Sequence, residues 1–287
     1  MQYFKRYYTK SFCYRQEFGE IRANSLKTKK LNVAIFERLD RVGKKILSTG
    51  NGRGNLTNKV LSVSNYHGKN PEFAGYALER FNNFSLKSFF SNLGLMFVEE
   101  DCKIYPSSMQ ANSVLDALRF GLQKSEAVVN VSEKVEKITR EGNGFKLTSS
   151  SGIYYAKNVV FAFGGKSQKQ FGTDGFGFEL AKQLGLKVSE LYPSLVQLKT
   201  NLDNIRGFKG IKSQVKVELL NGDELVNSTF GDLLFTDSGV SGNTIFYLSS
   251  YIHHLANPKL KIEFIPEITI NRLIDHLFFA NVQNSKA

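Results

Sequence analysis

Residues 43–58 read Gly43-Lys44-Lys45-Ile46-Leu47-Ser48-Thr49-Gly50-Asn51-Gly52-Arg53-Gly54-Asn55-Leu56-Thr57-Asn58, and they follow an apolar run, residues 31–36, that closes on Glu37. A short run rich in Val and Ile is typical of a buried parallel strand. In dinucleotide-binding folds, an acid at the carboxyl end of such a strand binds a ribose hydroxyl. The junction at Glu37 therefore predicts a strand followed by a ligand-binding loop.

The loop after this strand supplies groups that bind a pyrophosphate. Three glycines allow the backbone to approach an anion closely, and Lys44, Lys45 and Arg53 add positive charge. The spacing matches neither a Walker A motif nor G-x-G-x-x-G. On spacing alone, an ordinary turn with a solvated basic face explains the loop equally well.

The order of these residues resembles the signature of the aminoacetone-oxidase-type, or BaiN-like, flavoproteins. The matching positions are Glu37, Arg41–Leu47, Thr49–Arg53 and Asn55–Asn58. One departure is Gly54, where the family usually carries a cysteine. Further blocks at Cys102–Leu118, Asn158–Val196 and Gly231–Gly242 extend the resemblance over roughly residues 21–275.

The resemblance implies an α/β protein with a glutathione-reductase-like FAD-binding domain, incomplete in this chain, and an inserted, mainly β substrate or cap domain. We expect an atypical N-terminal segment at 1–22, a partial FAD-binding domain at 23–193 and a truncated β-rich domain at 194–287. The implied activity is hydride transfer between flavin and a small organic substrate or NAD(P)H. Relatives are described as aminoacetone oxidases and as reductases of bile-acid enones.

The resemblance also implies which residues contact FAD, whereas no catalytic acid or base is marked by spacing. The implied FAD contacts are Glu37, Arg38, Lys44, Lys45, Thr49, Gly50, Gly52, Arg53, Asn55, Leu56, Val135, Gly164 and Gly165. Without the family context, a buried strand with a tight turn explains Gly164 and Gly165 equally well.

The first 22 residues depart from this family pattern. A strand, a glycine fingerprint and a helix are expected before the acid-tipped strand. Instead we find only Gly19, no apolar strand, and many Tyr, Lys and Arg residues. One hypothesis is an out-of-frame or wrongly started translation, with family-like sequence resuming near Ile21, and the alternative is a natural divergent arm. A second functional hypothesis is thus a truncated or frameshifted flavoprotein remnant without activity.

The charge of the chain is concentrated near its start. Residues 1–60 carry 14 Lys or Arg and 4 Asp or Glu, which is +10 of the net +12. Because this charge lies on the glycine-rich loop and on the segment before it, we do not expect a nucleic-acid partner, although the Tyr- and Lys-rich residues 3–10 keep it as a third hypothesis. Nothing in the composition indicates an oligomeric state.

The cysteine, histidine and hydropathy patterns give no indication of a disulfide-rich, metal-binding or membrane protein. The chain has two cysteines, Cys13 and Cys102, and four histidines, with no spacing typical of a disulfide framework or a metal site. No apolar run approaches a membrane span and no signal-like segment opens the sequence, so we expect a cytoplasmic protein without a membrane partner.

Outside the loop, hydrophobic periodicity predicts the remaining elements. Apolar stripes predict helices over 85–94 and 112–122, with Ser85 capping the first. Residues 134–156 predict an antiparallel meander, and Asn221-Gly222 predicts a hairpin between strands at 215–220 and 225–230. We interpret Ser241 as a helix cap, because the glycines around it do not match a nucleophile elbow.

Overall fold

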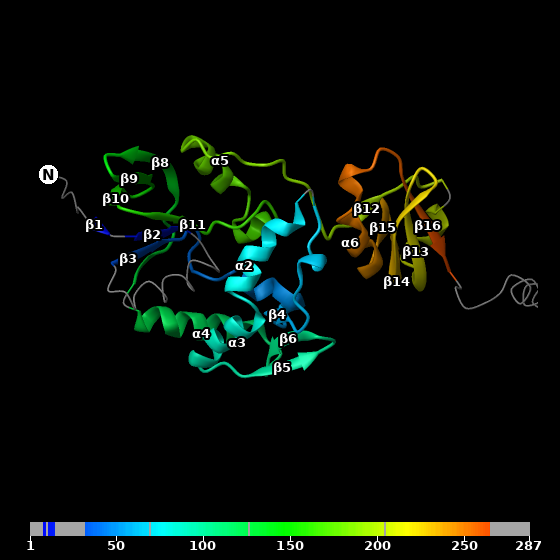
Figure 1. Cartoon of the computed structure of the whole chain (residues 1–287), viewed down its shortest axis with the longest axis horizontal. Coiled ribbons are helices and arrows are strands. Elements are labelled where there is room, and N and C mark those ends of the chain that lie inside the picture. The colour runs from blue at the N-terminus through cyan, green and yellow to red at the C-terminus, as the bar shows by residue number, and fades with distance from the viewer. Residues whose placement is uncertain are drawn as a thin grey trace, which may run out of the picture. The chain divides into compact units, whose positions relative to one another are not determined.

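The computed structural model describes residues 8–9, 11–14, 32–68, 70–125, 127–203 and 205–264, with only the backbone described before residue 32 (Figure 1). The chain divides into two compact units. The first unit comprises residues 1–65 and 72–190, and the second comprises residues 66–71 and 191–287. No sequence pattern predicts that the short segment 66–71 belongs to the second unit. The expected domain boundaries stay a prediction.

A four-stranded parallel sheet forms the centre of the first unit, in the order β11-β2-β3-β7. Its strands are β2 (Ser11–Tyr14), β3 (Val33–Phe36), β7 (Val128–Asn130) and β11 (Val159–Phe161). All three neighbouring pairs are parallel. Every residue of β3 is buried, which explains why this strand is apolar throughout. The strand predicted before Glu37 is therefore confirmed.

The expectation that residues 1–22 contain no strand is wrong. Ser11–Tyr14 forms β2, and β1 (Tyr8–Thr9) pairs with β10. Strand β2 lies between β3 and β11, with Ser11 opposite Val33 and Phe12 opposite Val159. Two parallel neighbours provide its backbone partners, so pairing overrides the weak strand propensity of the sequence. The predicted absence of a glycine turn and helix falls on residues 15–22, which lie outside the described residues.

The antiparallel meander that the sequence predicted is present, and it packs against the parallel sheet (Figure 1). Its strands are β8 (Val135–Glu141), β9 (Gly144–Ser149) and β10 (Ile153–Ala156). Phe36 of β3 joins Ile138 and Leu147 of the meander in one buried cluster. The ring of Phe36 also meets the edge of Tyr154, with 4.7 Å between ring centroids. Helix α5 (Phe176–Gln183) contributes Leu180 to the same cluster.

The rest of the first unit is a helical layer with a small antiparallel sheet, order β4-β6-β5. Its elements are β4 (Thr57–Asn58), η2 (Val63–Asn65), η3 (Pro71–Ala74), α2 (Gly75–Arg80), α3 (Asn83–Asn92), β5 (Phe97–Glu100), β6 (Lys103–Pro106) and α4 (Ala111–Lys124). Both predicted helices are present, but Ser85 does not cap α3. Asn82 is the cap, and its side chain accepts a hydrogen bond from the backbone N–H of Ser85 at 3.0 Å.

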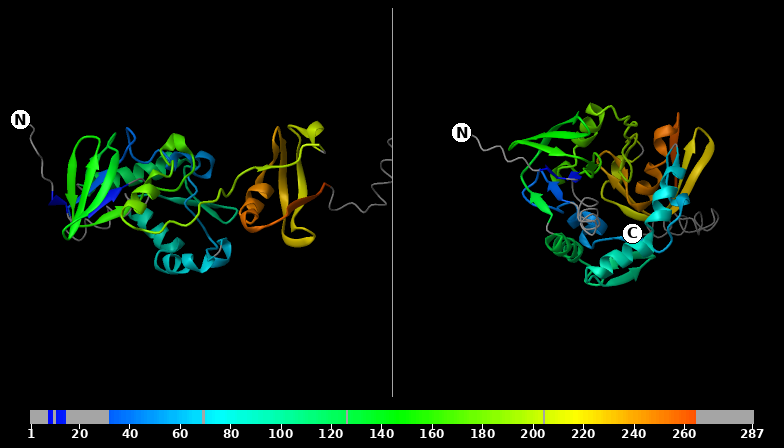
Figure 2. Two further views of the ribbon diagram at one scale, coloured as in Figure 1. Left: turned by 90° about the horizontal axis from the view of Figure 1, so that it is seen from above. Right: turned by 60° about the vertical axis from the view of Figure 1, so that its left-hand side comes forward.

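The second unit is a five-stranded sheet in the order β12-β15-β14-β13-β16 (Figure 2). Its elements are β12 (Leu198–Lys199), η5 (Arg206–Phe208), β13 (Lys212–Asn221), β14 (Glu224–Thr236), β15 (Gly239–Ser241), α6 (Asn243–Ser249), η6 (Ile252–His254) and β16 (Pro258–Glu263). The predicted hairpin is confirmed, since Asn221 pairs with Glu224 at its turn. Ser241 is not a helix cap, because it ends β15 and Gly242 precedes α6.

Alternating side chains build the core of this second unit. Val215, Val217 and Leu219 on β13 are fully buried, and they pack with Leu233 on β14 and Ile245 on α6. The alternation places apolar side chains on one face of the sheet, where α6 covers them. Among the residues described, no helix is long and apolar enough to cross a membrane.

Candidate cofactor site

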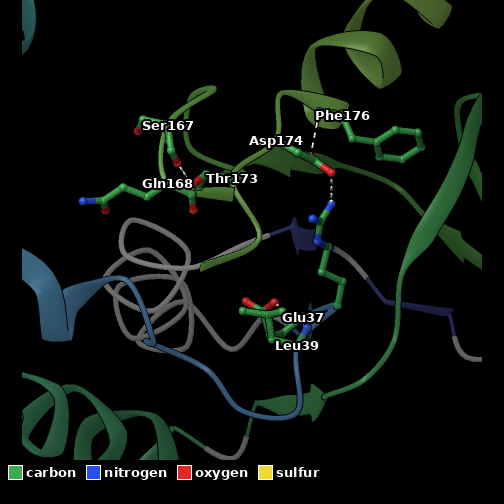
Figure 3. Close-up of polar contacts among 8 residues, drawn as sticks. Glu37, Leu39, Ser167, Gln168, Thr173, Asp174 and Phe176 are labelled. Carbon is green, nitrogen blue, oxygen red and sulfur yellow. Dashed lines mark hydrogen bonds and ion pairs between the residues drawn. The ribbon is translucent and has the colours of Figure 1, made fainter. Parts of the chain in front are cut away.

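Glu37 stands at the carboxyl end of β3, in the middle of the parallel sheet. Its backbone N–H donates to the carbonyl of Asn130 at 2.8 Å, and its Oε1 accepts the N–H of Leu39 at 2.8 Å (Figure 3). The residue is 0% exposed. The sheet therefore positions this carboxylate firmly, and a ribose can reach it only if the enclosing chain yields.

Arg38 joins the end of β3 to the loop that precedes α5. Its Nη1 contacts Oδ2 of Asp174 at 2.8 Å, and the other oxygen of Asp174 accepts the N–H of Phe176 at 3.1 Å (Figure 3). Burial works to raise the pKa of Asp174, but the hydrogen bonds from Phe176 and Arg38 outweigh it, so this pKa lies below its ordinary value. Asp174 is therefore a charged anchor for Arg38 at neutral pH.

The loop between β11 and α5 is shaped by its own short contacts. Gly164 adopts φ +71°, and a Cβ there would lie 2.9 Å from the side chain of Thr173. The hydroxyl of Thr173 donates to the carbonyls of Ser167 and Gln168 (Figure 3). The short 3-10 helix η4 (Lys169–Phe171) follows Gln168. At position 164, therefore, only a glycine fits without displacing Thr173.

The glycine-rich loop of residues 43–58, here called the signature loop, folds on itself around two residues whose backbone angles are left-handed. In η1 (Ile46–Gly52) the helical path breaks at Thr49, and Gly50 and Asn51 follow with φ 55° and 56°. The N–H of Gly54 then returns to the carbonyl of Thr49 at 3.0 Å. The glycine-rich sequence thus forms a compact turn.

Two contacts bring the signature loop against the β11–α5 loop. Lys45 Nζ lies 3.2 Å from the hydroxyl of Ser167, and Ser48 donates to the side chain of Gln168 at 3.3 Å. Lys44, in contrast, pairs with Asp40, and this lowers the pKa of Asp40. Among the residues described, Lys45 contacts no carboxylate. Of the basic side chains in the signature loop, Lys45 is therefore the one whose charge can bind a phosphate without first breaking an ion pair.

Several residues that the resemblance implies as FAD contacts make contacts within the protein. The Arg53 guanidinium binds Glu100 at 2.8 Å and the Tyr105 hydroxyl at 3.1 Å, and the hydrogen bond to Glu100 raises the pKa of Arg53. Val135 is 0% exposed in the meander core, and Leu56 packs against the α3–α4 cluster. Asn55 follows Gly54 and lies close to the turn. A Cβ at Gly50 would lie 2.7 Å from the backbone nitrogen of Asn55.

The structure thus brings together one part of the implied set. Glu37, Arg38, Lys45 and the loop after Gly164 and Gly165 lie around the end of β3, held by the contacts above. Residues not implied by the resemblance complete this arrangement, namely Ser167, Gln168, Thr173 and Asp174. Their signal in the sequence is the third family block, in which Thr173-Asp174-Gly175 precedes a predicted helix.

We expect Gly54→Ala to destabilise the protein more than Gly52→Ala. Both glycines have positive φ, 78° and 84°, so each substitution carries a strain of roughly 1–2 kcal/mol. At Gly54 a Cβ would also lie 2.9 Å from Cα of Ala111, whereas at Gly52 the nearest atom lies 3.9 Å away. Overpacking should add about 1–3 kcal/mol for Gly54 alone.

Urea unfolding of both variants tests this expectation, with Gly52→Ala as the matched control. Equal losses in the two variants would show that the signature loop does not pack on α4 as described.

A parallel sheet with an acid at the end of a central strand, flanked by two glycine-bearing loops, is the framework of a dinucleotide-binding domain. A family model, the HI0933-like protein Rossmann domain, matches residues 19–256. The chain therefore belongs to this family, which comprises BaiN-like, FAD-dependent oxidoreductases. The match begins after β2, close to the point where the family-like sequence was expected to resume.

Curated relatives carry two different names. A 3-dehydro-bile acid delta(4,6)-reductase of Clostridium scindens is 35% identical over 245 residues, covering 84% of this chain and 60% of the relative. A ribosomal RNA dihydrouridine synthase of Haemophilus influenzae is 26% identical over 250 residues, covering 85% of this chain and 61% of the relative. Its counterpart in Escherichia coli is 25% identical over 246 residues, covering 85% and 60%. The chain thus spans about three fifths of the length of these relatives.

Proposed function

We propose that this chain is an FAD-dependent reductase of a carbon–carbon double bond conjugated to a carbonyl group. The observation that carries this proposal is the 35% identity to a bile-acid reductase over 245 residues. Reduction at positions 4 and 6 of a 3-oxo steroid and reduction of uridine to dihydrouridine are the same chemistry, because each saturates a conjugated double bond. Bound FAD would supply the hydride for such a reaction.

The residues around β3 fit the adenosine diphosphate half of FAD in part. Glu37 would bind the ribose, Lys45 and Ser167 would bind the pyrophosphate, and the backbone at Gly164 and Gly165 would allow close approach. Two observations argue against a complete fit of FAD: the side chain of Glu37 is fully buried, and Lys44 is already paired with Asp40. We propose NAD(P)H as the electron donor and a small organic enone as the substrate, in preference to RNA, because the bile-acid reductase is the more similar relative.

A second candidate is a family member with weakened FAD binding and no activity, which is the remnant hypothesis. Strand β2 lies where the first strand of a dinucleotide-binding fold belongs, yet the next residues read Arg-Gln-Glu-Phe-Gly-Glu at 15–20. This order lacks the G-x-G-x-x-G fingerprint that binds a pyrophosphate. The missing fingerprint is the observation that favours this candidate.

An anaerobic assay with saturating FAD separates these candidates. The purified chain is given NADPH or NADH and a steroid 4-en-3-one, and the loss of the conjugated ketone is followed by ultraviolet absorbance and product mass. We expect enone-dependent oxidation of the nicotinamide. In a parallel series with FAD varied below saturation, Lys45→Ala should raise the FAD concentration that gives half-maximal activity at least tenfold, through weaker FAD binding.

Bound flavin without turnover of the enone would contradict the proposed substrate class, and an rRNA transcript in the same assay then tests uridine. Absence of flavin binding would instead support the remnant candidate. Lys59→Ala is the matched control, because Lys59 pairs with Glu99 at 3.1 Å on the small antiparallel sheet.

A further inference from the structure

The second unit contains a cavity of about 710 Å³ that no comparison assigns. It lies beside the five-stranded sheet, and residues of both edge strands, β12 and β16, contribute to its wall. The apolar side chains that line it include Leu198, Leu219, Val240, Ile252, Leu260 and Ile262. Its volume falls within the range of small-molecule pockets, and apolar walls with few polar groups are typical of them.

One polar group in this wall has no hydrogen-bond partner among the residues that the structure describes. Thr200 lines the cavity, and its hydroxyl oxygen is buried without a hydrogen bond. The backbone N–H of Thr200 donates to the carbonyl of Ser238 at 3.3 Å, which holds the residue in place. A buried hydroxyl without a partner is costly, so a rotation of the Thr200 side chain that turns this hydroxyl toward the cavity and onto a ligand atom would be stabilised.

The charged groups that line the cavity are all positive. They are Lys199, next to Thr200, and Lys259, whose Nζ also contacts Asp223 at 3.3 Å. Lys199 has no carboxylate within ion-pair distance among the residues described, and no acidic residue lines the cavity. The cavity therefore combines an apolar interior with a cationic rim, the polar side chain of Asn201 and a buried hydroxyl, that of Thr200, in its wall.

We propose that this cavity binds an elongated apolar monocarboxylate. Its hydrocarbon body packs between the side chains of β12, β13, β15 and β16. Its carboxylate accepts a hydrogen bond from Thr200, whose side chain rotates toward the cavity, and lies near the ammonium group of Lys199. The site belongs to the second unit alone, so the proposal is independent of the flavin chemistry proposed above.

Calorimetric titration of the full chain with dodecanoate tests this proposal. We expect saturable binding with a stoichiometry of one. Thr200→Val keeps the shape of the side chain and removes the hydroxyl, so it should weaken binding about tenfold or more. Lys199→Gln should reduce the preference for dodecanoate over dodecanol.

A blocking variant and a matched control locate the site. Leu260→Trp fills the cavity and should abolish binding, whereas Leu225→Trp, at a residue 55% exposed on β14 and outside the cavity, should leave it unchanged. Absence of saturable binding in the unmodified chain would overturn the proposal, since another part of the chain or water would then fill the cavity. Binding that Thr200→Val and Leu260→Trp both leave intact would overturn it equally, because the ligand would then bind elsewhere.

Discussion

Combining Arg15→Gly, Glu17→Gly and Glu20→Gly should tighten FAD binding about a thousandfold. These three substitutions create the order G-x-G-x-x-G directly after β2, whose parallel pairing with β3 and β11 places it as the first strand of the fold. Three charge-assisted hydrogen bonds to the pyrophosphate are each worth roughly 1.5–3 kcal/mol, so together they supply at least about three decades of affinity.

Titration of FAD into the triple-glycine variant and the unmodified chain measures this effect. The triple-alanine variant at the same positions is the matched control, because it removes the same charges without adding backbone freedom. If the alanine variant tightens FAD binding as much as the glycine variant, charge removal explains the gain and the role assigned to the fingerprint is wrong.

Phe36→Ala should destabilise the protein by about 3–5 kcal/mol. Phe36 is 0% exposed and lies in one buried cluster with Ile138 and Leu147 of the meander, to which β3 also contributes the smaller Ala34. Truncation of a buried Phe removes its burial free energy and leaves a cavity. The free energy of unfolding from urea denaturation, followed by circular dichroism, measures the loss.

Phe84→Ala is the matched control, since Phe84 is 75% exposed on α3 and its truncation should change stability by less than about 0.5 kcal/mol. Similar losses for the two variants would contradict the described packing of the meander on the parallel sheet. A large loss for Phe36→Ala would also weaken FAD binding indirectly, because Glu37 is the next residue in the chain.

Elements with strong local patterns were predictable from the sequence. The apolar run before Glu37, the alternation at Val215 and Val217 and the Asn221-Gly222 turn each became the expected element. Strand β2 was not predictable, because Ser-Phe-Cys-Tyr has neither a long apolar run nor flanking turn signals. Its conformation depends on backbone pairing with β3 and β11, which are distant in sequence.

The candidate site was only partly predictable for the same reason. The resemblance pointed to Lys45 and the loop after Gly164 as FAD contacts, since each is a local motif, and that role stays a prediction. The Arg38–Asp174 pair joins residues 136 positions apart, and Arg53 finds Glu100 47 positions away. Such long-range partners decide whether a basic side chain is free for a phosphate, and a single sequence does not contain them.

Titration of the unmodified chain with FAD, followed by the visible difference spectrum, tests the central claim that a flavin site remains around β3. We predict a saturable spectral change that Lys45→Ala weakens at least tenfold and Lys59→Ala leaves unaltered. A spectrum that does not change at any FAD concentration, or a change that Lys45→Ala leaves intact, would contradict the account.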